Sequence, residues 1–189
     1  QNRKRYVLLA SRTYANITVP KGNLRKIITV RQSIGSMKAI PAGHKDLSDY
    51  KHWSANLEAI NLSRIKSTSK NGGTRLEWKD DSHLQLQCYI GKDDHFPDVY
   101  GRMYWDLPSP TITTKFHSIT NGRFGHPEQD RAISLREGAI LQSFPNNYKF
   151  CSETVSVIAK MIGNAVPPKL AKAIGLSLQQ CYMNGTVQN

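Results

Sequence analysis

The sequence predicts a mixed α+β fold of short strands and amphipathic helices that are joined by polar loops. The run "YVLLAS" (residues 6–11) is short, apolar and flanked by arginines, which is typical of a buried strand. The segment "HLQLQCYIG" (83–91) alternates apolar and polar residues, which favours an exposed strand. Elsewhere apolar residues recur at the spacing of a helix that packs on one face. A hydrophobic fraction of 39% over 189 residues is enough for the core of one domain or of two small ones.

The first expected helix runs from Asp46 to about Leu62. Its apolar side chains share one face because they are three or four residues apart: Tyr50, Trp53, Leu57 and Ile60. The polar, glycine-rich stretch "STSKNGGTR" (67–75) that follows predicts a loop.

A second helix is expected after Ser134, which stands in a capping-box relation to Glu137. The serine oxygen can accept from an early backbone N–H, while the glutamate can reach back to the serine N–H. Pro145 and the two asparagines after it end this helix. Its buried face is expected to hold Ile140, Leu141 and Phe144.

A third helix is expected within "KMIGNAVPPKLAKAIG" (160–175), because Pro167 and Pro168 suit the first turn of a helix. Gly163 and Asn164 then form a tight turn that leads into its N-terminus, where unpaired N–H groups favour an anionic or polar ligand. A plain structural turn is the alternative. The apolar stripe of the helix comprises Leu170, Ile174, Leu178 and Cys181.

The charge is concentrated at one end of the chain. The formal net charge is +12, and residues 1–75 carry all of it, with 15 Lys and Arg against three acids. An excess of this kind favours a polyanionic partner such as nucleic acid over a merely solvated basic face.

The apolar segments and the cysteines indicate in which cellular compartment the protein is expected. No apolar run is long enough for a membrane span, and no signal-peptide pattern is present. Three widely spaced cysteines are typical of reduced thiols in a cytosolic protein, so a cytoplasmic protein is expected. The chain begins at Gln1, which suggests a fragment, a processed product or a trimmed chain.

Several stretches together resemble the cytosine-5 DNA methyltransferases. "IGNAVPPKLAKAIG" is similar to the last shared block of that family, and "HPEQDRAISLREGAILQSFPNNYKF" is similar to the block before it. "QNRKRYVLLASR" resembles the family's Gln-x-Arg-x-Arg block, and "YGRMYWDLPSPTITT" resembles the end of its recognition domain. The order of these motifs makes the resemblance specific, although the match is loose over residues 18–95.

The resemblance places this chain in the C-terminal portion of such an enzyme. The Gly-rich cofactor loop, the Pro-Cys-Gln nucleophile block and the Glu-Asn-Val block do not occur, so the nucleophile is assigned to none of Cys88, Cys151 and Cys181. The chain alone is therefore expected to be inactive. A partner subunit or an N-terminal half that carries the Pro-Cys-Gln block is implied. The resemblance, rather than the composition, also implies a prokaryotic, nucleoid-associated location.

The resemblance also implies roles for individual residues. Arg5 would lie against the flipped cytosine and stabilise the charge that develops when a thiolate adds to the ring, while Arg3 and Gln1 would hold the DNA backbone beside it. A solvated basic strand edge is the alternative. Asn164, Ala165 and Val166 would contact the methionine end of S-adenosylmethionine; the alanine, often a serine in the family, leaves only backbone contacts there.

Contacts with double-stranded DNA are expected from two further places. Gly72 and Gly73 could let the backbone approach DNA, with Arg75 on a phosphate or a guanine edge; a flexible surface loop is the alternative. Thr111 and Thr113 resemble a family signature that touches the DNA backbone.

Arg131, Arg136 and Glu137 are interpreted as scaffold that orients the recognition domain. Trp53, Trp78 and Trp105 are interpreted as core anchors rather than stacking platforms. No metal is expected, because the closest grouping, His83, Cys88 and His95, lacks the paired spacing of zinc sites.

The predicted architecture is a small mixed α+β recognition domain with C-terminal strand and helix segments of an S-adenosylmethionine-dependent α/β methyltransferase fold. Residues 1–15 would end the catalytic region, 16–125 would form the target recognition domain, and 126–189 would hold the C-terminal motifs. The expected function is DNA target recognition and completion of the active site for methyl transfer to C5 of cytosine, within a restriction-modification system. The alternative is a non-catalytic basic DNA-binding module derived from such an enzyme.

Overall fold

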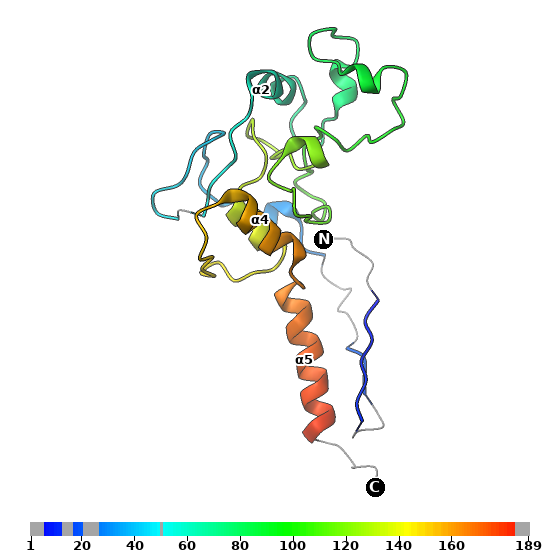
Figure 1. Cartoon of the computed structure of the whole chain (residues 1–189), viewed down its shortest axis with the longest axis vertical. Helices are drawn as coiled ribbons and strands as arrows, with labels where there is room; N and C mark the ends of the chain where they lie inside the picture. The colour runs from blue at the N-terminus through cyan, green and yellow to red at the C-terminus, as the bar shows by residue number, and fades with distance from the viewer. Residues whose placement is uncertain (1–5, 13–16, 21–26, 50, 184–189) are drawn as a thin grey trace.

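The computed structural model describes residues 6–12, 17–20, 27–49 and 51–183. Five α-helices are present in these ranges, and the last of them extends away from the body of the molecule (Figure 1). They are α1 (Val30–Ile34), α2 (Ala59–Lys66), α3 (Leu135–Leu141), α4 (Val155–Asn164) and α5 (Pro168–Met183). Three short 3-10 helices accompany them: η1 (Arg75–Trp78), η2 (Gln87–Tyr89) and η3 (Ile119–Asn121).

The two predicted strands are not formed in the residues that the structure describes. Residues 6–11 make no strand pairing, and Tyr6 and Leu8 are almost fully exposed rather than buried. Segment 83–91 folds as turns and η2, because the Asp81 carboxylate accepts hydrogen bonds from the backbone of the next residues and starts a turn. Leu84 is buried in the core from this turn, and Leu86 packs against the same cluster. The alternation of apolar and polar residues therefore reflects which side chains are buried, although the segment does not pair as a strand.

Pairing between extended segments is limited to isolated bridges in the described ranges. Lys45 pairs with Trp53, while Gly125 pairs with both Arg102 and Ala132. The helical part of the predicted α+β class is therefore observed, and a sheet is not seen in this part of the chain.

The predicted helix 46–62 is wrong, because α2 begins only at Ala59. The carboxylates of Asp46 and Asp49 accept hydrogen bonds from the backbone N–H two residues ahead, at 3.0 and 3.1 Å, and so favour turns over a helix. Trp53 still packs against the core, as its apolar spacing indicated, but it does so from a loop. Tyr50 lies outside the described residues.

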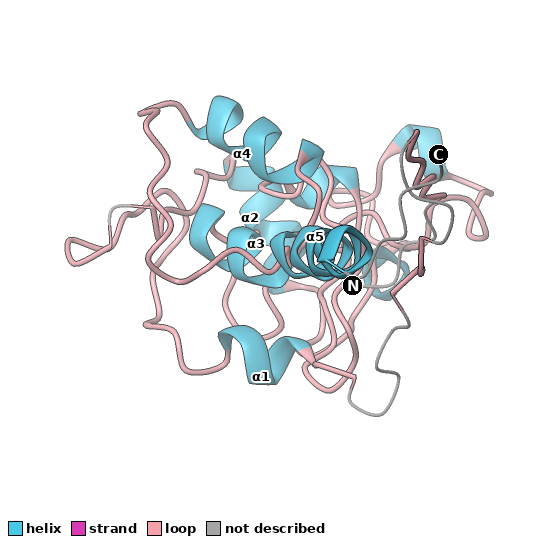
Figure 2. Ribbon diagram, turned by 90° about the horizontal axis from the view of Figure 1, so that it is seen from below, coloured by secondary structure: helices cyan, strands magenta, loops and turns pink. Residues whose placement is uncertain are grey.

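Two hydrophobic clusters form the interior. The larger one joins α1, α3 and α4, which lie together in the view from below (Figure 2). The smaller one comprises residues of α2, η1, η3 and the segments between them and after them: Ile65, Trp78, Leu84, Tyr100, Ile119 and Ala132. Trp53 and Trp105 pack against the larger cluster and Trp78 is buried in the smaller one, so their interpretation as core anchors is confirmed.

Two of the three helices near the C-terminus, α3 and α5, begin where the sequence predicts, whereas α4 was not predicted. Ser134 caps α3 in a complete capping box with Glu137, and α5 begins at Pro168. However, α3 ends at Leu141 rather than at Pro145, because Ser143 has a φ of 71° and leaves the helical conformation.

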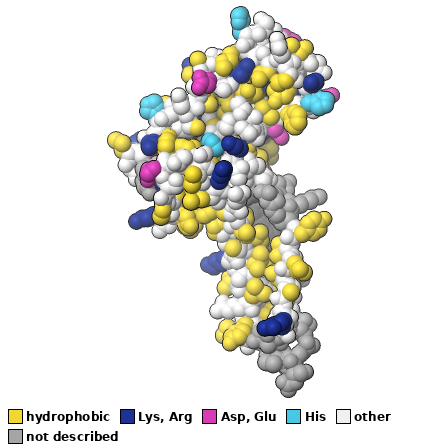
Figure 3. Space-filling view, viewed as in Figure 1, with side chains coloured by type: hydrophobic (Ala, Val, Ile, Leu, Met, Phe, Trp, Pro, Cys, Tyr) yellow, Lys and Arg dark blue, Asp and Glu magenta, His cyan; other side chains and the backbone are white. Residues whose placement is uncertain are grey.

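The projecting part of the molecule is rich in exposed apolar side chains (Figure 3). On α5, Leu176 is 50% exposed and Leu178 is 40% exposed. The Ser177 hydroxyl donates to the carbonyl of Thr18, which ties the segment 17–20 to this helix. In the described residues, no helix combines the length and hydropathy that crossing a membrane would require.

Candidate functional site

Gly163 and Asn164 are the last two residues of α4, so the expectation of a tight turn at these two residues is wrong; the chain leaves the helix at Ala165. This end of α4 is held in place from α3. The Ala165 N–H donates to the carbonyl of Ile162 at 3.2 Å, which closes the end of α4. The buried side-chain amide of Gln142 donates to the carbonyls of both Ile162 and Ala165, at 3.2 and 3.1 Å. One glutamine therefore satisfies the last carbonyls of α4 and fixes the path of the chain there.

Gly163 allows α4 to lie directly on the backbone of the 113–114 segment. A Cβ atom at this position would be 2.4 Å from the carbonyl carbon of Thr113 and from the nitrogen of Thr114. No side chain fits such a gap. The structure thus brings Gly163, which precedes the predicted cofactor contact Asn164, against the backbone of Thr113, which is predicted to contact DNA.

The three predicted cofactor residues lie at the surface. Asn164 is exposed, Ala165 is half-buried, and Val166 is 60% exposed. In the part of the chain that the structure describes, the Asn164 side-chain amide makes no hydrogen bond. This amide is accordingly a donor and acceptor available to a polar ligand.

The N-terminus of α5 does not offer the unpaired N–H groups that the sequence suggested. The Lys169 N–H donates to the Ser143 hydroxyl at 3.2 Å, while those of Leu170 and Ala171 donate to the carbonyl of Pro167. The expectation of an anion site at this helix start is therefore wrong. The hydrogen-bonding groups available to a ligand here are those of the Asn164 side chain instead.

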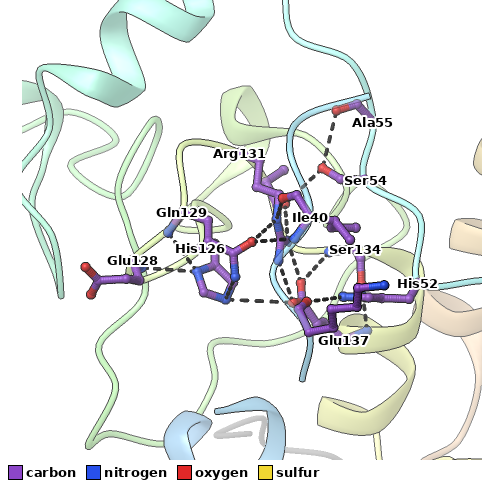
Figure 4. A network of polar contacts seen from close by, with 12 residues as sticks. Ile40, His52, Ser54, Ala55, His126, Glu128, Gln129, Arg131, Ser134 and Glu137 are labelled. Carbon is purple, nitrogen blue, oxygen red and sulfur yellow. Dashed lines mark hydrogen bonds and ion pairs between the residues drawn. The ribbon is translucent and has the colours of Figure 1, made fainter. Parts of the chain in front are cut away.

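Behind the site, Arg131 and Glu137 form a fully buried ion pair (Figure 4). Two parallel hydrogen bonds of 2.7 Å join the guanidinium and the carboxylate. Burial opposes ionisation of Glu137, but the hydrogen bonds and charge of Arg131 outweigh it, so the pKa of Glu137 lies below its ordinary value. The same carboxylate accepts from the N–H of Ser134 at 2.6 Å.

His126 lies beside this pair and is neutral at neutral pH. Burial lowers its pKa to about 4, although the charge of Glu137 acts in the opposite direction. Its Nδ1 accepts from the backbone N–H of Glu128 and Gln129, at 3.1 and 3.0 Å, which requires an unprotonated nitrogen there. Its Nε2 lies 3.7 Å from Glu137 Oε1, a contact without ion-pair character because the ring is uncharged.

The same network fixes residues 38–54 to α3. His52 Nε2 lies 2.7 Å from the carbonyl of Lys38, and its Nδ1 lies 2.8 Å from the Ser134 hydroxyl. Because a carbonyl only accepts, Nε2 is the donor in the contact with Lys38. The Leu135 N–H donates to the carbonyl of Trp53 at 3.1 Å, so the chain itself caps this helix.

Arg136 makes a second link to the same segment. Its guanidinium donates twice to the carboxylate of Asp49, at 2.6 and 3.1 Å, and once to the carbonyl of Tyr148. Burial opposes ionisation of Asp49, but the hydrogen bond and charge of Arg136 prevail and its pKa is lowered. Arg131 likewise donates to the carbonyl of Ile40. The contacts confirm a scaffold role for the arginines and for Glu137.

Gly72 and Gly73 are buried and serve internal packing. A Cβ on Gly72 would be 2.0 Å from the ring of Tyr104, and one on Gly73 would be 2.3 Å from the carbonyl oxygen of Ser69. Gly72 also has a φ of 107°, a conformation that residues with a side chain rarely adopt. The loop is therefore fixed by its surroundings.

Arg75 is fully buried and is not available as a surface contact in this structure. Its Nη2 donates to the carbonyls of Lys92 and His95 at 2.9 and 2.7 Å, and its guanidinium lies 4.3 Å from the ring centroid of Tyr89. Nε and Nη1 have no hydrogen-bond partner. The side chain fixes the loop around residues 89–95 in place of the DNA contact expected.

Thr113 is exposed, and Thr111 is half-buried on the same segment. Gln1, Arg3 and Arg5 lie outside the described residues. Over 6–12, 17–20, 27–49 and 51–183, no group of His, Cys, Asp and Glu has the arrangement of a metal site.

Sequence reasoning missed the role of Gln142 in holding the end of α4. In the sequence, Gln142 is only one residue of the block "HPEQDRAISLREGAILQSFPNNYKF". Its position among the apolar residues of the helix expected there was the available signal of a buried amide with a specific partner.

The comparisons with known proteins agree on one family. The profile of the family described as C-5 cytosine-specific DNA methylase matches residues 1–180. The chain is similar to the type II methylase M.HgiDII of Herpetosiphon aurantiacus, with 42% identity over 95% of the chain and 51% of that relative. It is also similar to DNA (cytosine-5)-methyltransferase 3 of Arabidopsis thaliana, with 34% identity over 81% of the chain and 12% of that relative. The chain thus spans about half the length of the bacterial relative and a small part of the plant one.

Proposed function

Since the chain belongs to the C-5 cytosine-specific DNA methylase family, we propose that it recognises the DNA target and completes the active site for methyl transfer from S-adenosylmethionine to C5 of cytosine. The observation that carries the proposal is the end of α4, where Gln142 holds the backbone at Ile162 and Ala165. This end presents the Asn164 amide, and Gly163 packs on the Thr113 backbone. The proposed setting is a restriction-modification system, since relatives carry the names type II methylase and type II methyltransferase.

The residues at the end of α4 fit the methionine end of the cofactor. A side-chain amide both donates and accepts, as an amino group and a carboxylate require. The half-buried Ala165 leaves room for the backbone to take part, and its carbonyl is held by Gln142. When bound, the cofactor supplies the methyl group; the chain's own share is to orient its methionine end through Asn164, Ala165 and Val166.

Arg5 would act on the cytosine itself. A fixed guanidinium near the ring oxygen stabilises the negative charge that develops when a thiolate adds to the ring, and its planar fork suits this better than the point charge of lysine. Arg3 and Gln1 would position the DNA backbone beside it, with Thr111 and Thr113 as further backbone contacts. The basic residues 1–75 would supply the electrostatic attraction to the duplex.

The nucleophile and the rest of the cofactor pocket belong to a catalytic half that carries the Pro-Cys-Gln block. The exposed apolar side chains of residues 6–8 and of α5 are a surface that such a half would cover. The chain together with this half is called the assembled enzyme below.

The first test uses Arg5→Ala in the assembled enzyme, with Arg12→Ala as a control in the same basic stretch. Removing one fixed cation from the transition state is expected to lower turnover about 100- to 1,000-fold. The dissociation constant for DNA should change far less. Equal losses in turnover and affinity would contradict the transition-state role.

The second test uses Asn164→Ala, with Asn147→Ala as a control at another exposed asparagine. Loss of charge-assisted hydrogen bonds to the cofactor is expected to raise its KM roughly 10-fold or more, because such bonds contribute about 1.5–3 kcal/mol. An unchanged KM for S-adenosylmethionine would remove Asn164 from the cofactor site.

A further inference from the structure

Tyr104 presents an aromatic ring that packs on glycine backbone and is partly exposed. The residue is 39% exposed, although Met103 before it is fully buried. The ring rests on the backbone of Gly72, so closely that a Cβ there would lie 2.0 Å from Cε1. The absence of a side chain at Gly72 therefore makes room for this ring.

A fixed cation lies over the ring and helps to hold it in place. The guanidinium carbon of Arg123 lies 5.2 Å from the ring centroid of Tyr104. Arg123 donates to the carboxylate of Asp98 at 2.7 Å and to the carbonyls of Gly72 and Arg102 at 2.9 and 3.1 Å. With its side chain only 13% exposed, Arg123 is immobilised as part of the support.

The loop beneath the ring is also pinned. Asn71 has a φ of 55°, and its side-chain oxygen accepts from the backbone N–H of Trp105 at 2.7 Å. Its own N–H donates to the carbonyl of Pro127 at 2.8 Å. The ring and its support thus form one unit whose geometry is set before any ligand arrives.

Nothing in the described parts of the chain uses the exposed side of this ring. The Tyr104 hydroxyl makes no hydrogen bond to any described residue. Among the same residues, the Tyr104 ring makes one cation–π contact, with Arg123, and no contact with another aromatic ring. A surface aromatic held on glycine backbone and an immobile arginine offers contact area to a planar group at little cost in conformational entropy.

We propose that Tyr104 is a stacking platform for an unstacked nucleobase of the DNA substrate. The inference rests on the proposed function and identifies a contact within it. A nucleobase fits because each base has a π-face, and because the chain's net charge of +12 draws a polyanion to its surface. An enzyme that works on an extruded base also leaves its neighbours unstacked and in need of a new surface.

The test measures DNA binding by the assembled enzyme with Tyr104→Leu and Tyr104→Phe. Leucine keeps apolar contact with Gly72 but lacks a π-face, so affinity should fall about 5- to 150-fold, the range of base–aromatic stacking. Phenylalanine keeps the ring and should bind as the wild type does. Phe96→Leu is the matched control, because Phe96 is 69% exposed in an acidic stretch with Asp93, Asp94 and Asp98.

A second readout does not depend on the leucine variant being folded. Duplexes with 2-aminopurine at successive positions around the target should show one position whose fluorescence is quenched on binding wild-type enzyme, and Tyr104→Leu should restore its emission. Wild-type affinity in a folded Tyr104→Leu variant would overturn the inference, as would the absence of any quenched position.

The methylation activity of the same preparation separates this inference from the proposed function. Active wild-type enzyme with unchanged DNA binding in Tyr104→Leu would refute the platform alone. Wild-type assembled enzyme that neither binds nor methylates DNA would refute the proposed function. If the Tyr104→Leu chain no longer bound the catalytic half but kept its affinity for DNA, the ring would be a contact between proteins, and the inference would be overturned.

Discussion

Replacing Gly163 with alanine tests whether the proposed cofactor contact at Asn164 depends on close contact between α4 and the 113–114 segment. The new Cβ would lie 2.4–2.5 Å from three backbone atoms, namely the carbon and oxygen of Thr113 and the nitrogen of Thr114. Backbone cannot rotate away as a flexible side chain does. Helix α4 or the segment must therefore shift, and Asn164 shifts with it.

The magnitude follows from two opposing effects. Alanine in place of glycine favours a helix by about 0.5–1 kcal/mol. Overpacking a filled site costs about 1–3 kcal/mol. The second effect prevails, and the thermal midpoint of a protein of this size should fall by about 2–4 °C for each kcal/mol of net loss.

The assay compares Gly163→Ala with Gly175→Ala in the assembled enzyme. Gly175 lies within α5, and a Cβ there would have no neighbour within 4 Å. Gly175→Ala should therefore be neutral or raise the midpoint, whereas Gly163→Ala should lower it and raise the KM for S-adenosylmethionine. Equal effects of the two substitutions, or a stabilised Gly163→Ala with wild-type KM, would refute the reasoning.

Three further predictions concern the buried network and the exposed helix. Glu137→Gln removes the charge that pairs with buried Arg131, so the free energy of unfolding should fall by about 3–5 kcal/mol; a midpoint near that of the wild type in thermal melts would contradict this. His126 has a folded pKa of about 4 against an ordinary 6.5, so stability should be full above pH 6.5 and fall as the pH drops towards 4, by up to about 3 kcal/mol. His126→Asn, which keeps an acceptor, should flatten this part of a pH series of melts; an unchanged slope would assign it to other groups. Without its catalytic half the chain should self-associate, and Leu176→Glu with Leu178→Glu should reduce this in sedimentation experiments, while a monodisperse, stable wild-type monomer would show that no missing half is needed to cover α5.

The parts of the fold that the sequence predicted are those with local signals. The capping box at Ser134 and the prolines before α5 each act within one helical turn, so their consequences are readable from neighbouring residues. The expected helix 46–62 failed because Asp46 and Asp49 make local hydrogen bonds that its apolar spacing does not reveal. Tertiary context decided that segment through the contacts of Trp53 and His52 with the region around α3.

The candidate site shows the same division. The motif indicated Asn164 as a candidate cofactor contact but wrongly predicted a turn there instead of the end of α4. The hydrogen bonds by which Gln142 holds this end span about twenty residues of chain. Arg75 was expected to contact DNA because it follows the two glycines of a polar loop, and only the structure shows the carbonyls that hold it inside. Tyr104 gave no sequence signal, because its support by Gly72 and Arg123 is made entirely through tertiary contacts.

The most direct measurement of the central claim is to capture the native protein from its source cells and assay what comes with it. We expect a polypeptide that carries a Pro-Cys-Gln block, either as a longer form of this chain or as a separate companion. The captured material should transfer a labelled methyl group from S-adenosylmethionine to C5 of cytosine in DNA, and the 189-residue chain alone should not. Capture of no such polypeptide, with DNA binding but no methyl transfer, would contradict the account and leave a non-catalytic DNA-binding module of the same family.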